Sequence, residues 1–108
     1  VFSAGADIRD RASKPREPGE GLAHLRRARE AFHAVFECRK PVIGAINGPA
    51  IGLGNDVASL CDIRIASSTA RFGATFLKMG LLPGDGGAWL LPRHIGWSRA
   101  AQLFFTGE

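Results

Sequence analysis

The chain has 108 residues, a length that fits one small domain, and 45% of its residues are apolar, as in an ordinary globular protein. Its formal net charge is +4, but the basic residues are scattered and no aromatic side chains alternate with them, so nucleic acid is not an expected partner. No apolar run approaches the roughly eighteen residues of a membrane-spanning helix, so we expect no membrane partner either.

The first residues predict the end of a strand followed by a turn. Val1 to Ser3 are compatible with a strand, and Gly5 breaks the chain within a group of small residues that permits close backbone approach. The next segment, residues 10–21, contains prolines, glycines and charges, which predicts a surface connection.

A helix is expected from Gly21 to Lys40, because its apolar residues recur at intervals of three and four. His24 and His33 lie on this helix. No acid stands near either of them in the sequence to orient an imidazole, so we interpret both as surface or packing residues and not as general bases.

The centre of the chain runs from Lys40 to Asp62. Val42 to Ile46 predict a buried strand, Asn47-Gly48-Pro49 a turn, and Asn55 to Cys61 a helix. A strand that passes through a glycine-rich turn into a helix leaves backbone N–H groups unpaired at the helix start, where they can hold an oxyanion.

Asp56 lies in the first turn of that helix and has two interpretations. It is either a helix-start acid favoured by the helix dipole or a functional carboxylate beside the turn. The glycines of the turn also suggest a dinucleotide site, but Gly48, Gly52 and Gly54 do not have the G-x-G-x-x-G spacing.

The last third of the chain predicts two strands and two helices. Strands are expected over residues 62–67 and 70–73, then a helix over residues 88–91 that ends near Pro92, and a final helix between Gly96 and Gly107. Cys38 and Cys61 have no metal-ligand or C-x-x-C spacing, which predicts free thiols in a reducing compartment, the cytoplasm, and no metal site.

Three blocks occur in the order found in one family: VFSAGADIRD, NGPAIGLGNDVASLCDIRIAS and FLKMGLLPGDGGAWLLPRHIG. The chain resembles the enoyl-CoA hydratase/isomerase (crotonase) family. This resemblance implies an α/β fold, a crotonase-like (ClpP/crotonase) spiral of ββα units, present here in part as a single-domain fragment over residues 1–108. It also implies an acyl-CoA thioester as substrate, no further cofactor because coenzyme A is part of the substrate, and a homotrimeric or homohexameric parent. A plain α/β layer fold fits the same element order.

The resemblance also assigns site residues. The backbone N–H groups of Ala6 and Leu53 correspond to the oxyanion hole, and Asp56 corresponds to a glutamate of the hydratases. A second family glutamate is replaced by Phe76, which transfers no protons and is expected to form a wall of the acyl pocket. Asp85 is the remaining candidate acid, with helix capping as the alternative role. Further substrate or CoA contacts are implied at Ala4, Asp7, Ile8, Gly52 and Gly54, and basic residues near the first turn, such as Arg9, Lys14 and Arg16, meet either CoA phosphates or solvent.

The leading hypothesis is therefore an acyl-CoA-binding enzyme that stabilises a thioester enolate and moves protons through aspartates. The alternative is a catalytically inactive binding or assembly module of the same fold, which the phenylalanine at position 76 favours. A nucleotide binder is a third reading, supported only by the glycine content.

Overall fold

The computed structural model describes residues 1–7, 9, 17 and 19–108. Ile8 and most of the charged segment that follows it, including Lys14 and Arg16, lie outside the described residues. In chain order the elements are α2 (Glu20–Phe36), β1 (Ile43–Ile46), β2 (Ala50–Ile51), α3 (Leu53–Leu60), β3 (Ile63–Ala66), β4 (Phe72–Gly73), the 3₁₀-helix η1 (Thr75–Met79), α4 (Gly87–Ile95) and α5 (Trp97–Thr106).

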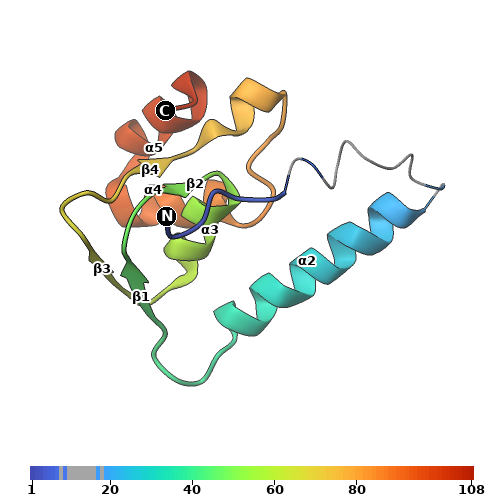
Figure 1. The fold of residues 1–108 in the computed structure, drawn as a ribbon, viewed down its shortest axis with the longest axis horizontal. Coiled ribbons are helices and arrows are strands. Elements are labelled where there is room, and N and C mark those ends of the chain that lie inside the picture. The colour runs from blue at the N-terminus through green and yellow to red at the C-terminus, as the bar shows by residue number, and fades with distance from the viewer. Residues whose placement is uncertain (8, 10–16, 18) are drawn as a thin grey trace.

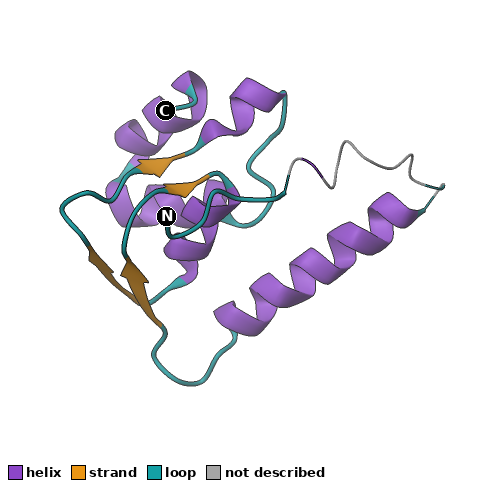
Figure 2. Ribbon diagram, in the orientation of Figure 1, coloured by secondary structure: helices purple, strands orange, loops and turns teal. Residues whose placement is uncertain are grey.

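The strands form two small parallel pairs, which Figure 2 shows beside the helices. β1 pairs with β3, with Ile43 opposite Ile63, and β2 pairs with β4, with Ala50 opposite Phe72. The strand predicted over Val1 to Ser3 is reduced to one parallel bridge between Ser3 and Ala50. The predicted mixture of short strands and helices is confirmed.

The core lies where the two strand pairs meet α3. Ile46, Ala50 and Ala58 are almost completely buried, and Phe2 and Ala70 pack against them. This cluster fixes the start of α3 relative to β2, and therefore places the glycine-rich turn between them.

The helix predicted over residues 21–40 is present but shorter, and its apolar face is not part of the core. α2 has no buried residue, and Figure 1 shows it extending away from the other elements. The helix predicted from the amphipathic pattern is confirmed. Its apolar face, which is not buried in the core, borders a cavity described below.

The expected end of the helix near Pro92 is wrong. α4 continues to Ile95 with Pro92 inside it. A proline removes one backbone hydrogen bond, but Leu90 and Leu91 just before it are buried, and Gly96 N–H still donates to the Pro92 carbonyl at 3.0 Å. Side-chain burial therefore outweighs the local preference. The helix η1 was not predicted.

Candidate active site

Two glycine-containing turns lie against each other at the start of α3. Gly5 has φ +92° and Gly52 has φ +56°, conformations that other residues rarely adopt. A Cβ atom built on Gly5 would lie 3.5 Å from the Leu53 nitrogen, so the first turn passes directly beside the second. A Cβ on Gly54 would collide with the Ser3 carbonyl oxygen and lie 2.8 Å from the Ser3 Cβ. Glycine is therefore required for this close approach.

Hydrogen bonds hold both turns in place without using the N–H groups assigned to the oxyanion hole. Ile51 N–H donates to the Ser3 carbonyl at 2.9 Å, and Gly52 N–H donates to the Gly73 carbonyl at 2.8 Å. Within the described part of the chain, neither the Ala6 N–H nor the Leu53 N–H donates a hydrogen bond to the protein. Two neighbouring turns thus each offer a backbone donor.

Asp56 is the most unusual residue of the site. Its side chain is 0% exposed, and among the described residues neither carboxylate oxygen has a hydrogen-bond donor. The carboxylate lies against Gly87, the first residue of α4, where a Cβ atom would overlap an Asp56 oxygen. A buried polar group without a partner destabilises the folded state. Such a group calls for an explanation other than stability, and a role in chemistry is one.

Asp85 lies close enough to influence Asp56. The pKa of Asp56 is raised from 3.8 to about 7, first by burial and then by the negative charge of Asp85, while the neighbouring Gly87 N–H acts in the opposite direction. Burial also raises the pKa of Asp85. The charge of Asp85 therefore acts on Asp56, and the pKa of Asp56 lies in the range typical of groups that exchange protons at neutral pH.

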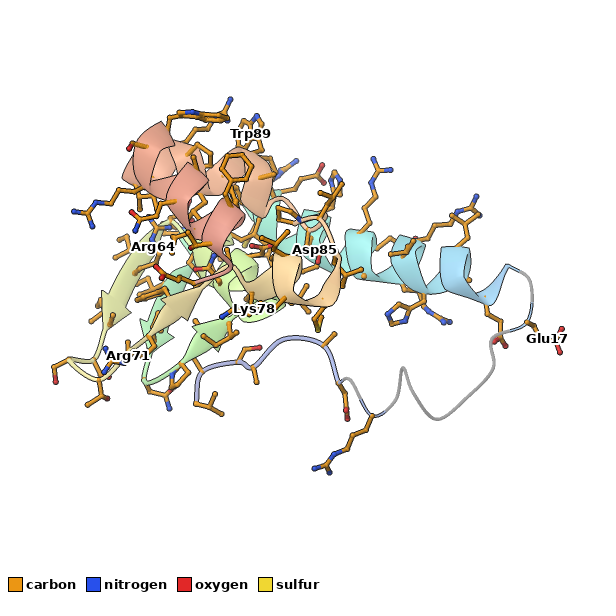
Figure 3. All side chains as sticks on the ribbon, turned by 90° about the horizontal axis from the view of Figure 1, so that it is seen from above. Glu17, Arg64, Arg71, Lys78, Asp85 and Trp89 are labelled. Carbon is orange, nitrogen blue, oxygen red and sulfur yellow. The ribbon has the colours of Figure 1, made fainter. Side chains whose placement is uncertain are left out.

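A cavity of about 530 Å³ lies between α2 and α4 and includes Asp85. Apolar side chains dominate its wall, with two basic residues contributed by α2. The lining residues are Leu25, Arg29, Phe32, His33, Phe36, Leu60, Gly84, Asp85, Gly86, Trp89 and Leu90. Figure 3 shows Asp85 in the region between η1 and α2.

The other predicted residues occupy different surroundings. Ala4, Ala6 and Asp7 are exposed in the first turn, so they are accessible to a ligand. Phe76 is buried in η1 and is not among the residues that line the 530 Å³ cavity. Its expected role as an acyl-pocket wall stays a prediction.

Three residues of the site were missed or given another role by the sequence reasoning. Asn55 is buried and its side-chain nitrogen has no acceptor among the described residues. Gly87 borders Asp56, and His33, interpreted as a surface or packing residue, lines the cavity. The premise that no acid stands near His33 was wrong, because its Nδ1 lies 3.6 Å from Glu37 Oε1, one helical turn along α2. The spacing of His33 from Leu25 and Phe36 on one face of α2 was the available signal.

The remaining sequence expectations concern thiols, metals and membranes. Cys38 is exposed and Cys61 is buried, and both are free thiols. The described ranges contain no group of three or more histidine, cysteine or acidic residues placed to hold a metal ion. In the same part of the chain, no helix combines the length and the hydropathy needed to cross a bilayer.

The raised pKa of Asp56 predicts a stability that falls with increasing pH. Below about pH 3.8 the carboxyl is protonated in both folded and unfolded chains, so its burial carries no charge penalty. Between 3.8 and about 7 the unfolded chain binds fewer protons than the folded one, so the free energy of unfolding decreases by on the order of 4 kcal/mol. In thermal unfolding followed by circular dichroism, Asp56→Asn should lack this decrease. Parallel pH curves for the two proteins would contradict the prediction.

The structure is an α/β protein in which a turn containing Gly5 lies against the turn containing Gly52, at the start of a helix that carries the buried acid Asp56. Comparison with known proteins identifies the family. The family described as enoyl-CoA hydratase/isomerase matches residues 1–108, so the chain belongs to this family. Its fold is the crotonase-like fold that the resemblance implied.

Individual relatives support the same assignment. The chain is 43% identical over 106 residues to a probable enoyl-CoA hydratase, EchA14, of Mycobacterium tuberculosis, covering 96% of this chain and 41% of that protein. It is 42% identical over 107 residues to a short-chain-enoyl-CoA hydratase of Clostridium acetobutylicum, covering 99% and 40%. The crystal structure of an enoyl-CoA hydratase from Bacillus anthracis matches with a TM-score of 0.87 and 40% identity, over 97% of this chain and 40% of that one. The chain thus spans about 40% of the length of these relatives.

Proposed function

We propose that the protein processes an acyl-CoA thioester, with Ala6 and Leu53 N–H groups holding the thioester oxygen and Asp56 transferring a proton. The observation that carries this proposal is the Asp56 carboxyl itself. It lies in the first turn of α3, its side chain is completely buried, its oxygens have no hydrogen-bond partner among the described residues, and the charge of Asp85, in the turn before α4, raises its pKa.

The proposed chemistry needs one proton-transfer group and one anion site. Ionised Asp56 removes a proton from a carbon of the acyl group, and the electron pair of the broken C–H bond moves onto the thioester oxygen to give an enolate. Two N–H donors stabilise the negative oxygen, each worth roughly 2.7–4 kcal/mol of the barrier in comparable sites. Protonated Asp56 then returns the proton to a carbon, which completes an isomerisation, and its pKa near 7 suits both directions of transfer.

Hydration requires a second group that orients a water molecule, and Asp85 is the candidate. Its carboxylate acts on Asp56 electrostatically and lines the adjacent cavity. Phe76 replaces the second glutamate that the family resemblance implies, so we favour isomerisation or slow hydration over fast hydration. No cofactor beyond coenzyme A enters this scheme. The trimeric or hexameric assembly and the cytoplasmic location remain predictions.

An inactive binding or assembly module is the second candidate, and the apolar residue at position 76 favours it. The two candidates differ in whether the protein turns over an enoyl-CoA at all. Incubating the protein that carries this chain with crotonyl-CoA and with a β,γ-unsaturated acyl-CoA, and separating the products chromatographically, distinguishes them. Binding without any product would support the module.

Phe76→Glu tests the geometry of the second acid. If position 76 faces the substrate, a carboxylate there restores the anchor for a water molecule, and hydration of crotonyl-CoA should increase, by roughly ten-fold or more. Leu77→Glu, an adjacent and exposed position on η1, is the matched control for added charge. An equal effect of the two substitutions, or no gain at position 76, would place Phe76 away from the acyl group.

A further inference from the structure

The apolar face of α2 carries two basic residues that the proposed chemistry does not use. Leu25, Arg29, Phe32, His33 and Phe36 are separated by steps of one, three or four residues, so they share one side of the helix, and all five line the 530 Å³ cavity. A cavity of this size lies within the range of about 300–1,000 Å³ that is typical for small-molecule sites. Arg29 and His33 therefore supply the polar groups of an otherwise apolar wall.

Arg29 is oriented but not neutralised. Its Nε donates a hydrogen bond to His33 Nε2 at 3.4 Å, and His33 Nδ1 lies 3.6 Å from Glu37 Oε1. Because Nε2 accepts this bond, the imidazole proton belongs on Nδ1, facing Glu37. Among the described residues, no carboxylate lies within salt-bridge distance of Arg29, and its terminal amino groups donate no hydrogen bond. The free edge of such a guanidinium matches a carboxylate with two parallel hydrogen bonds.

The opposite wall is formed by α4 and the turn before it, and it includes the candidate acid Asp85. The ring of Phe36 meets Trp89 edge-on, with centroids 6.1 Å apart, and the Arg93 guanidinium lies 3.8 Å from the Trp89 ring centroid. Arg93 also donates to the Trp89 carbonyl at 2.7 Å. Asp85 and its glycine neighbours, Gly84 and Gly86, complete this wall.

We propose that this cavity selects acyl groups that carry a carboxylate at the end distant from the thioester, and that Arg29 binds that carboxylate. The inference rests on the proposed function. Asp56 and Leu53 do not line this cavity, but Asp85, whose charge acts on Asp56, does, so the cavity adjoins the proposed reaction site and can receive the distant end of the acyl group. The phosphates of coenzyme A are the other anionic groups of the ligand. The aromatic lining and the nearby acid favour an acyl chain over a nucleotide, and the resemblance puts coenzyme A along the Ala4–Asp7 turn instead.

The test compares two enoyl-CoA thioesters with acyl chains of equal length, one ending in a methyl group and one in a carboxylate. The protein that carries this chain should have at least a ten-fold higher kcat/KM for the carboxylate-ended thioester. Arg29→Met keeps the apolar stem and removes the charge, and should lower that kcat/KM by roughly 10–100-fold, the usual range for a hydrogen bond to a charged group. The methyl-ended thioester should change less than about two-fold.

Two further variants make the result specific. Arg26→Met removes the same charge from α2 at a position that is exposed, as Arg29 is, but does not line this cavity, and it should leave the preference unchanged. Arg29→Lys keeps the charge but loses the planar fork, and should retain part of the preference.

The possible outcomes separate the two proposals. An equal loss for both thioesters in Arg29→Met would show that Arg29 binds a coenzyme A phosphate, and would overturn the inference, as would a wild-type protein without preference. If neither thioester is turned over, the proposed function fails. In that case the affinities of the two saturated acyl-CoA analogues, measured by calorimetry, test the inference separately from the proposed function. Tighter binding of the carboxylate-ended analogue that Arg29→Met abolishes would support the inference, and equal affinities would refute it.

Discussion

Asp56→Asn is expected to lower kcat on an enoyl-CoA substrate by roughly 10²–10⁴-fold, the usual loss when a positioned acid–base group is removed. Binding of the thioester should change little, because the amide has nearly the same shape and the oxyanion donors belong to the backbone. The buried Asp56 carboxyl, with a pKa of about 7, can both accept and return a proton. An amide in its place does neither, because it has no group that titrates in this range.

The measurement is kcat and KM from initial rates, together with the affinity for a saturated acyl-CoA. Asp62→Asn is the matched control, because Asp62 is an exposed acid whose Oδ2 accepts a hydrogen bond from Val42 N–H at 2.8 Å, and an amide oxygen can accept the same bond. It should keep wild-type turnover. If Asp56→Asn also kept it, Asp56 would be reduced to a helix-start residue.

Asp56 also shows how stability and activity oppose each other in this site. Among the described residues the Asp56 oxygens have no well-formed hydrogen bond, and the nearby Gly87 N–H offsets only part of the effect of burial on its pKa. The ionised carboxyl therefore lowers the stability of the folded chain at neutral pH, and its replacement by an amide is expected to remove the charge penalty. A residue present only to cap α3 would accept hydrogen bonds from the first turn and would have a lowered pKa. The observed environment is the opposite, which favours the functional interpretation of Asp56.

The sequence predicted the elements that depend on short-range signals. The β-branched run before Asn47-Gly48-Pro49 predicted β1, and the glycines at positions 52 and 54 predicted the turn and the start of α3. The expectation that this strand is buried was wrong for one of its faces, because Ile43 is exposed and burial alternates along β1. Asp62, just before β3, holds the start of that strand beside β1, because its Oδ2 accepts a hydrogen bond from the Val42 N–H. These features succeed because turn chemistry and apolar alternation act over a few residues.

Features that depend on distant contacts were not predictable in this way. The passage of α4 through Pro92 depends on burial of Leu90 and Leu91 against other elements. The cavity is formed by α2, α3 and α4 with the turn before α4, and no local pattern shows how these segments meet. The sequence named Asp56 and Asp85 separately, whereas their proximity depends on Gly87 allowing α4 to approach α3.

Gly87→Ala is expected to lower turnover by roughly 10²-fold, because a methyl group at this position occupies the space of the Asp56 carboxylate and displaces it. Gly87 does not have a positive φ and is the first residue of α4, so alanine fits the backbone there without strain. Any loss of activity or stability must therefore come from the side-chain overlap, which typically costs about 1–3 kcal/mol in a packed site.

A double-mutant cycle separates this overlap from a general weakening of α4. Gly87→Ala should lower the unfolding free energy when Asp56 is present, and should be neutral or stabilising in the Asp56→Ala background, where the two methyl groups share the vacated space. Gly21→Ala in α2 is the control, because a Cβ there has no neighbour within 4 Å and should change neither turnover nor stability through contact. An equal loss of unfolding free energy on Gly87→Ala in both backgrounds would show that Gly87 does not position the acid. Unchanged turnover in Gly87→Ala would show that the Asp56 carboxylate does not act on the reacting carbon atoms.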